Sequence, residues 1–253
     1  MAWDPKIYLD FESERTRPAA ELLARVRCDD PGPVIDLGCG PGNSTALLAR
    51  RWPKAQLEGL DSSEAMLDQA RRSGVAAQWR AGDISAWSPD RHYDVIFSNA
   101  TIQWVGAQEN LLPRLMSALA LDGIFAFQVP CNFNEPSHRL MREVAEQGPW
   151  AAKLKSVRNL ILGTAQGYYD ILEPHASALD IWETTYLQIL EGEDAVFRWV
   201  SGTGLRPFLD ALDGADRDGF VSAYKKCLAL AYPMRASGKV LFPFQRLFVV
   251  ARR

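Results

Sequence analysis

The stretch VIDLGCGPG, residues Val34 to Gly42, joins a short apolar run to three closely spaced glycines. The run follows Pro31-Gly32-Pro33, which breaks the preceding segment, so it is typical of a buried strand. Glycines directly after a strand allow a sharp turn with positive φ and let a ligand approach the backbone. The N-terminus of a following helix can then face that ligand. The stretch therefore predicts a strand, a tight turn that can bind a ligand, and a helix in succession.

Helices and strands alternate around this turn. The spacing of apolar residues predicts helices over 17–26, 43–51, 63–72 and 111–121, and strands over 34–37, 56–60, 76–80, 93–98 and 124–129. Five strands interleaved with helices predict a parallel, doubly wound sheet. The last apolar run, 245–251, follows no short parallel crossover, and this predicts an antiparallel strand at the sheet's edge.

The alternation stops after Pro130. Helices are predicted over 135–147, 151–162, 195–212 and 216–232, with a strand over about 180–190. We therefore predict an α/β fold of the Rossmann-like, doubly wound kind, with a seven-stranded sheet that is mostly parallel, an antiparallel edge strand and a helical cap. All of it is predicted to form one domain over 1–253, with a cofactor-binding core at about 30–130 and cap or substrate insertions at about 131–180 and 191–240.

Composition narrows the class of protein. The chain has 253 residues, of which 47% are hydrophobic and 23% charged, values of an ordinary globular protein. A net charge of -3 gives no general attraction for phosphate backbones, so we expect no nucleic-acid partner. Neither a signal peptide nor a membrane-spanning apolar run is recognisable, which predicts a cytoplasmic protein without a membrane partner. We also expect a monomer or a weak homo-oligomer. The four cysteines lack zinc-ligand spacing, so no metal is expected.

Acidic residues follow the second and third predicted strands. Asp61 stands where a carboxylate can accept both ribose hydroxyls of a nucleoside, although the residue by itself is equally typical of a helix N-cap. After Gly82, Asp83 can reach an adenine amino group with Ile84 beside the ring, and a plain turn is the alternative. The glycine spacing is G-x-G-x-G, and Asn43 stands where a dinucleotide fingerprint has Gly or Ala, which disfavours NAD.

Taken together, these motifs resemble those of the class I S-adenosylmethionine-dependent methyltransferases. The resemblance includes D-x-G-x-G-x-G after the first strand, an acid after the second, G-D after the third and D-x-x-x-S-N at the fourth, and covers about half of the chain. It implies S-adenosylmethionine as cofactor. It also implies that Asp36 or the backbone of Gly38 and Gly40 holds the methionine portion, that Asp61 binds the ribose, that Met66 and Ile84 flank the adenine, that Asp83 contacts its amino group, and that Ser98 and Asn99 line the methyl end.

A more specific resemblance runs along nearly the whole chain. The segments MAWDPKIYLDFESERTRPAAELL, FSNATIQWV, SGTGLRPFLDAL and LFPFQRLFVVA are similar to those of the trans-aconitate 2-methyltransferases. This resemblance implies that the product is the monomethyl ester of trans-aconitate or a related small polycarboxylate. Three alternatives stay open: a methyltransferase for another small or acyl-chain carboxylic acid, an NAD(P)-dependent oxidoreductase, and a non-catalytic module that only binds the cofactor.

A carboxylate substrate needs no general base, because it is already ionised at pH 7. The three histidines show no triad pattern, and we predict no acid-base catalytic residue. A polyanion does need cations, and the planar guanidinium of arginine matches a carboxylate with two parallel hydrogen bonds. The candidates are Arg206 and Arg246, followed by Arg15 and Arg17, and for each of them a surface charge or an ion pair is the alternative.

Gln103 and Trp104 follow the fourth strand, on the carboxyl edge where doubly wound folds bind ligands. We predict that they face the substrate, with core packing as the alternative. Trp3, Tyr8 and Phe11 form an aromatic N-terminal arm that is predicted to close over the cofactor pocket, with stapling to the core as the alternative.

Overall fold

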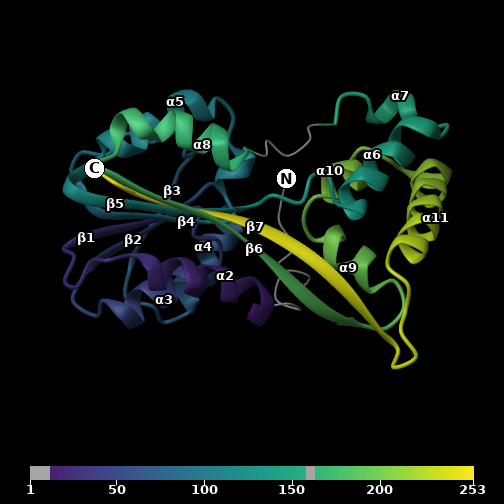
Figure 1. Ribbon diagram of the computed structural model, residues 1–253, viewed down its shortest axis with the longest axis horizontal. Helices are drawn as coiled ribbons and strands as arrows, with labels where there is room; N and C mark the ends of the chain where they lie inside the picture. Colours follow the sequence, from purple (N-terminus) through teal and green to yellow (C-terminus); the bar gives the residue numbers. More distant parts are fainter. Residues whose placement is uncertain (1–11, 158–162) are drawn as a thin grey trace. The chain divides into compact units, whose positions relative to one another are not determined.

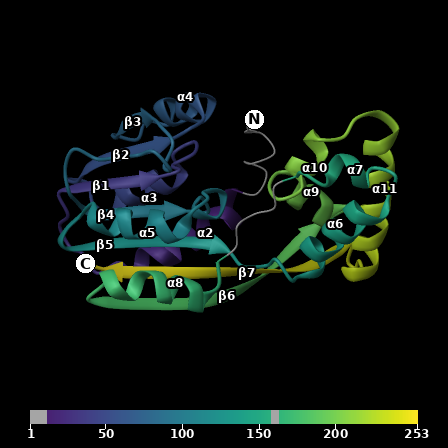
Figure 2. The ribbon, with the colours of Figure 1, turned by 90° about the horizontal axis from the view of Figure 1, so that it is seen from above.

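The fold is known from a computed structural model, which describes residues 12–157 and 163–253. In this part of the chain seven strands form one sheet, in the order β3-β2-β1-β4-β5-β7-β6, and Figure 2 shows them side by side in that order. Their bounds are β1 Pro33–Leu37, β2 Gln56–Asp61, β3 Gln78–Ala81, β4 Tyr93–Asn99, β5 Leu119–Pro130, β6 Ala178–Glu191 and β7 Lys239–Arg252. The predicted seven-stranded, Rossmann-like sheet is confirmed.

The strand order creates a switch point beside β1. From β1 the chain proceeds outward to β2 and β3, and then returns to the other side of β1 with β4 and β5, all of them paired in parallel. Ligands of open parallel sheets bind outside the carboxyl ends of the strands at such a point. β7 pairs antiparallel with β5, as the lack of a crossover predicted, but it is the second strand from the edge because β6 lies outside it.

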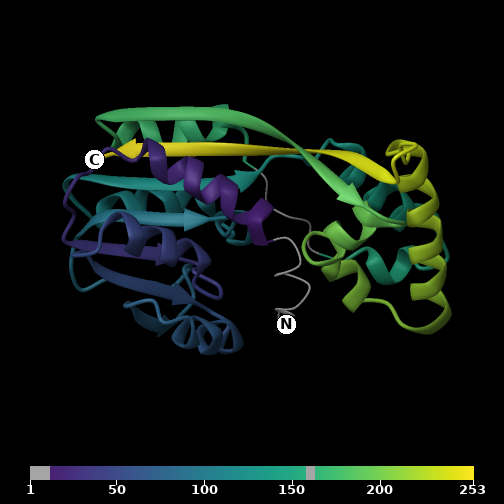
Figure 3. The same ribbon diagram turned by 90° about the horizontal axis from the view of Figure 1, so that it is seen from below.

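Helices cover both faces of the sheet. Figure 1 shows α5 and α8 on one face and α2 and α3 on the other, and Figure 3 views the sheet from the side of α2, the purple helix. The bounds are α2 Glu12–Arg25, α3 Asn43–Arg51, α4 Glu64–Arg72, α5 Gln108–Ser117 and α8 Ala165–Leu172, with the short 3-10 helices η1 Ile102–Trp104 and η2 Glu173–His175.

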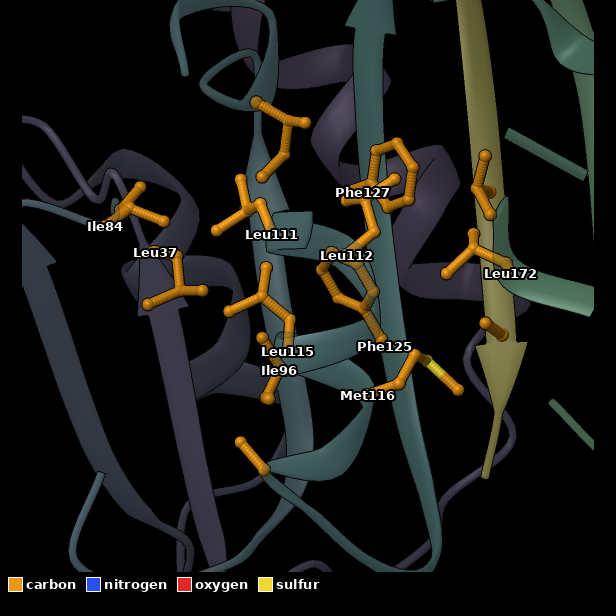
Figure 4. Close-up of a cluster of buried hydrophobic side chains, with 14 of the residues drawn as sticks. Leu37, Ile84, Ile96, Leu111, Leu112, Leu115, Met116, Phe125, Phe127 and Leu172 are labelled. Carbon is orange, nitrogen blue, oxygen red and sulfur yellow. The ribbon is translucent and has the colours of Figure 1, made fainter. Parts of the chain in front are cut away.

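The hydrophobic core under α5 joins this helix to the sheet. Leu111, Leu112 and Leu115 of α5 lie against Phe125 and Phe127 of β5, whose rings stack with centroids 4.9 Å apart (Figure 4). The alternation of a strand sends every second residue of β5 to this face, so the intervening residues face α2. Burial of these aromatic and aliphatic side chains fixes the register of the strands, and with it the place of each residue at the carboxyl edge.

On this side, one predicted boundary and one unpredicted helix differ from the sequence analysis. The helix predicted over 111–121 ends at Ser117, because Leu119 already pairs with Tyr93 in the sheet. Helix α8 was not predicted at all. It belongs to the range 131–180 that was assigned to the cap, yet it packs on the sheet beside α5, where Tyr168 meets the edge of Phe127 with ring centroids 5.1 Å apart.

The chain divides into two compact units. The first holds β1 to β5, the parts of β6 and β7 at 178–184 and 246–252, and the helices that cover them. The second comprises residues 132–157 and 185–245 of the described chain, which include the remaining parts of β6 and β7. Its helices are α6 Pro136–Gln147, α7 Ala151–Leu154, α9 Ala195–Ser201, α10 Arg206–Asp210 and α11 Gly214–Ala231. Assignment of the whole chain to one domain stays a prediction. No described helix is both long and apolar enough to span a membrane.

The helices predicted for the second unit are partly confirmed. α6 and α11 lie within two residues of their predicted bounds. The single helix predicted over 195–212 is two helices, since Gly202 and Gly204 follow α9 and Pro207 lies in the first turn of α10. The helix predicted over 151–162 is reduced to α7, and the last five residues of that range lie outside the described part.

Candidate functional site

The glycine turn connects β1 to α3 in the left-handed backbone region. Gly38, Gly40 and Gly42 have φ values of 74°, 55° and 95°, which residues with a Cβ rarely adopt. A Cβ on Gly38 would lie 2.2 Å from the side chain of Thr101, so this glycine serves close packing. A Cβ on Gly40 would meet no described atom within 4 Å. The face of the turn at Gly40 is therefore the one that a ligand can approach.

Asp36 lies fully buried at the end of β1, directly before the turn. Its Oδ2 accepts hydrogen bonds of 2.7 Å from the hydroxyls of Ser44 and Thr45, in the first turn of α3. Its Oδ1 is buried with no hydrogen-bond partner among residues 12–157 and 163–253. Burial raises the pKa of Asp36 to about 6, against the two hydroxyl bonds, which lower it, and the charge of Asp61 adds to the rise. A buried acceptor left open beneath a ligand-binding turn is suited to a cationic group.

Replacing Asp36 by asparagine is expected to stabilise the ligand-free protein above pH 6. The pKa of Asp36 is about 6 in the folded state, above its usual 3.8. The contribution of this carboxyl to the free energy of unfolding is therefore fully present below pH 3.8 and is lost as the pH rises to about 6. The amide has no such loss, and we expect a gain on the order of 1–2 kcal/mol at pH 7 that vanishes at pH 4. Urea unfolding of both proteins between pH 4 and pH 8 measures it, and parallel curves would contradict it.

Asp61 ties the second strand to the glycine turn. Its Oδ2 accepts the backbone N–H of Gly40 at 2.9 Å, and its Oδ1 accepts the N–H of Ser63 at 2.8 Å. The side chain is half-buried at the end of β2. Each carboxylate oxygen has a second lone pair, so Asp61 can hold the turn and accept a ligand's hydroxyl groups at the same time. The structure thus gives Asp61 a structural role in addition to the predicted ribose contact.

The three residues predicted around an adenine lie after β2 and β3. Met66 is buried in the first turn of α4. Ile84 is also buried and belongs to the core cluster, with Leu37 at the end of β1 and Leu60 one residue before the end of β2. Asp83 is exposed and accepts the N–H of Ser85 at 2.8 Å, a bond that lowers the pKa of the carboxyl. The plain turn weighed for Asp83 is therefore present, and the ionised carboxylate keeps lone pairs for an amino group.

The end of β4 places two predicted residues differently. The Ser98 hydroxyl is fully buried and donates to the carbonyl of Leu37 at 2.8 Å, so it joins β4 to β1 inside the sheet. Asn99, the last residue of β4, is only half-buried. Ala100 follows with φ 56°, an unusual backbone for alanine that redirects the chain at the strand's end. Asn99 is thus better placed than Ser98 to meet a ligand.

Arg246 and a glutamine that the sequence prediction missed extend this edge. Arg246 of β7 is only 8% exposed and donates from a terminal guanidinium nitrogen to Gln128 Oε1 at 3.2 Å. Gln128 is fully buried in β5, and its Nε2 donates to Asn99 Oδ1. The signal for Gln128 was present in the run FAFQVP, where one amide interrupts an otherwise apolar strand.

The other predicted substrate residues are dispersed. Gln103 of η1 is buried and donates to the carbonyl of Ala100 at 2.6 Å, whereas Trp104 is 40% exposed. Arg206 belongs to the second unit, where its Nε lies 3.7 Å from Asp210 one turn along α10. Arg17 forms an exposed ion pair with Glu21 on α2. The side chain of Arg15 and the arm residues Trp3, Tyr8 and Phe11 lie outside what the structure describes.

The negative charge near the glycine turn favours a positively charged cofactor over a dinucleotide. Asp36 and Asp61 bring two carboxyl groups to the ends of neighbouring strands, and the first turn of α3 holds no cation. The pyrophosphate of a dinucleotide would be repelled there. S-adenosylmethionine carries a sulfonium and an ammonium group, which this environment attracts, and its ribose hydroxyls suit Asp61. The residues present therefore fit S-adenosylmethionine, and the NAD alternative is disfavoured by charge as well as by glycine spacing.

Comparisons with known proteins agree with this geometry. A family model described as a methyltransferase domain matches residues 34–123. A trans-aconitate 2-methyltransferase from Azoarcus sp. (strain BH72) is 50% identical over 252 residues, 99% of each chain. Another, from Paracidovorax citrulli (strain AAC00-1), is 51% identical over 256 residues, 99% of this chain and 98% of the relative.

Solved structures share the fold. The YcgJ protein from Bacillus subtilis has a TM-score of 0.63 at 12% identity, over 94% of this chain and 98% of the other. A Haemonchus contortus phosphoethanolamine N-methyltransferase 2, solved with S-adenosylhomocysteine, has a TM-score of 0.55 at 16% identity, over 93% of this chain and 52% of the other. At such low identity the likeness concerns the fold alone.

Proposed function

Because this chain belongs to the trans-aconitate 2-methyltransferase family, we propose that it transfers a methyl group from S-adenosylmethionine to one carboxylate of trans-aconitate. The protein is a methyltransferase, and S-adenosylmethionine is its methyl donor. One observation carries the substrate assignment: identity of about 50% continues over 99% of the chain, well beyond the methyltransferase domain at 34–123 and through the whole second unit. Substrate choice in such folds depends on the parts outside the cofactor core.

The reaction asks little acid-base chemistry of the protein. When bound, S-adenosylmethionine supplies a methyl group on a positively charged sulfur. A carboxylate oxygen of the substrate forms the new bond to that carbon as the carbon–sulfur bond breaks, and the electron pair of the broken bond stays on sulfur. No proton moves, so no base is required. The residues of this chain contribute by holding both partners in line and by excluding water.

Different parts of the site would hold the two partners. Asp36 and the glycine turn would hold the methionine portion of the cofactor, with Asp61 on the ribose. A remaining carboxylate of the substrate would bind to the guanidinium group of Arg246, and the substrate contact of Arg206 stays a prediction from the sequence. Support for Arg246 comes from its burial at the carboxyl edge of the sheet, two residues along β7 from the partner of Gln128. A buried guanidinium is a strong site for a bidentate carboxylate contact.

Two arginine variants test the substrate contacts. Arg246→Lys keeps the charge but removes the planar fork, and Arg206→Ala removes a charge from the second unit. For each we expect the KM for trans-aconitate to rise about tenfold, near 1.4 kcal/mol, with the affinity for S-adenosylmethionine unchanged. Steady-state kinetics and calorimetry measure the two quantities. Arg217→Ala, on α11, is a control for loss of charge in the second unit, and an unaltered KM in either test variant would exclude that arginine from the site.

A labelled-methyl assay tests the reaction itself. Purified protein is incubated with trans-aconitate and S-adenosylmethionine carrying a labelled methyl group, and we expect a base-labile methyl ester together with S-adenosylhomocysteine. Straight-chain fatty acids of increasing length serve as competing substrates for the acyl-chain alternative. Ester formed on the fatty acids but not on trans-aconitate would overturn the substrate and leave the methyltransferase standing. A cytoplasmic location and a monomeric or weakly oligomeric state stay predictions.

A further inference from the structure

A row of three polar side chains crosses the carboxyl edge of the sheet. Asn99 pairs in register with Gln128 between β4 and β5, and Arg246 of β7 pairs with Pro130, two residues beyond Gln128. Residues two apart on a strand share a face, so Asn99, Gln128 and Arg246 all lie on the same side of the sheet. Hydrogen bonds connect Arg246 to Gln128 and Gln128 to Asn99. These bonds link residues of three adjacent strands.

The chemistry of the groups fixes the direction of every bond in this row. A guanidinium has only donors, so Gln128 must turn its Oε1 towards Arg246. The Nε2 of the same planar amide then points the other way and must find an acceptor, which is Asn99 Oδ1. Since Asn99 Oδ1 accepts this bond, its Nδ2 lies at the other end of the planar amide, turned away from Gln128. The guanidinium of Arg246 therefore determines the orientation of the Gln128 amide and, through it, that of the Asn99 amide.

The orientation of the Asn99 amide affects ligand binding, because Asn99 lies at the end of β4. Asn99 is the half-buried member of the row, whereas Gln128 is fully buried and Arg246 nearly so. An amide at the end of β4 that presents N–H groups attracts a carboxylate, and one that presents its oxygen repels it. A glutamine also costs free energy inside an apolar strand unless both ends of its amide are bonded, as they are here.

We propose that Gln128 is a positioning residue for substrate binding, which makes Asn99 present its Nδ2 N–H groups to a carboxylate of the substrate. The proposal rests on the function proposed above, since it assigns the carboxylate to trans-aconitate. Gln128 itself does not touch the substrate. It transmits the donor-only character of Arg246 to Asn99, so substrate affinity depends on a residue inside the sheet.

The test measures binding of trans-aconitate by calorimetry to the full chain saturated with S-adenosylhomocysteine, which needs no turnover. Gln128→Met fills a similar volume and removes both hydrogen bonds. We expect its Kd for trans-aconitate to rise about tenfold while the affinity for S-adenosylhomocysteine stays within twofold. In an Asn99→Ala background, where no amide is left to orient, the same substitution is expected to raise the Kd less than threefold. An equal rise in both backgrounds would overturn the proposal.

Two further variants distinguish a change in the orientation of Asn99 from a general loss of folding. Gln128→Glu keeps the shape and the bond to Arg246, but its carboxylate has only acceptors, so Asn99 must turn its N–H groups towards it. We again expect a higher Kd for trans-aconitate. In the Asn99→Ala background the same substitution is expected to leave the Kd unchanged. Gln108→Met is the matched control, because Gln108 is a second buried glutamine that bonds the carbonyl of Ile102 outside the row. Its Kd for trans-aconitate should be unchanged.

The two proposals fail in different ways. If trans-aconitate binds the unsubstituted protein but gains no labelled methyl group, the proposed function fails and the role of Gln128 is still decided by the Kd values. If trans-aconitate is methylated and the Gln128 variants bind it as tightly as the unsubstituted protein, only the role of Gln128 fails. Absence of binding to the unsubstituted protein would overturn both.

Discussion

Gly38→Ala is expected to lower the free energy of unfolding by about 3 kcal/mol, the largest effect on folding predicted for the glycine turn. The backbone at Gly38 has φ 74°, which costs a residue with a Cβ about 1–2 kcal/mol. The new Cβ would also lie 2.6 Å from Cβ of Thr101 and still closer to the ends of that side chain. Rotation of Thr101 cannot relieve a contact with its own Cβ, so backbone must move, at a further cost of about 1–3 kcal/mol.

Gly40→Ala is the matched variant and separates folding from binding. Its φ of 55° imposes a similar backbone cost, but the added methyl group meets no described atom within 4 Å. We therefore expect a loss of only about 1 kcal/mol in stability together with greatly weakened binding of S-adenosylhomocysteine. Urea unfolding and calorimetry measure the two properties. Binding of S-adenosylhomocysteine at its original affinity would show that the cofactor does not approach the turn at Gly40.

Sequence reasoning succeeded where a local pattern determines the structure. The glycines of Val34 to Gly42 require a left-handed turn, and the turn has it at all three positions. The acid at Asp61 follows the second strand, and the fold brings it to the turn through its bond to Gly40. In such a fold, consecutive parallel strands end at the same edge of the sheet. Residues at strand ends could therefore be placed together before any contact was known.

The parts that could not be predicted depend on contacts between distant segments. Leu119 continues a helical pattern with Leu111 and Leu115, but its pairing with Tyr93 makes it the first residue of a strand. Ser98 was assigned to the methyl end by the family resemblance, through the D-x-x-x-S-N pattern, and the structure shows its hydroxyl bonded to the carbonyl of Leu37. Such outcomes follow from which face of β4 meets which neighbour, and one sequence does not contain that information.

Polar residues inside the sheet were the least predictable part of the site. Asp36 or the backbone of Gly38 and Gly40 was predicted to hold the methionine portion. The bonds of Asp36 to Ser44 and Thr45, which leave its Oδ1 open, depend on how α3 packs. Gln128 carried only the signal of an amide within an apolar run. Its importance emerges from the register of β4, β5 and β7, which places it between Asn99 and Arg246.

Asp61→Ala is expected to weaken binding of S-adenosylmethionine by about 2 kcal/mol, or roughly thirtyfold. Two causes contribute. The carboxylate is predicted to accept the ribose hydroxyls in charge-assisted hydrogen bonds. It also accepts the N–H groups of Gly40 and Ser63, so its removal breaks the hydrogen bonds that hold the glycine turn in place even without a ligand. Asp68→Ala is the control, because Asp68 is an exposed acid on α4 whose carboxylate bonds Arg71.

A change in the ligand separates these two causes. S-adenosylhomocysteine and its 2′-deoxy analogue differ by one ribose hydroxyl, and calorimetry gives the affinity of each for the unsubstituted protein and for Asp61→Ala. If Asp61 binds the ribose directly, the substitution costs less free energy with the deoxy ligand, since one of its hydrogen bonds is already absent. If Asp61 acts only by holding Gly40 and Ser63, both ligands lose the same amount. The direct contact would then be excluded, and the acid after β2 would serve the geometry of the turn alone.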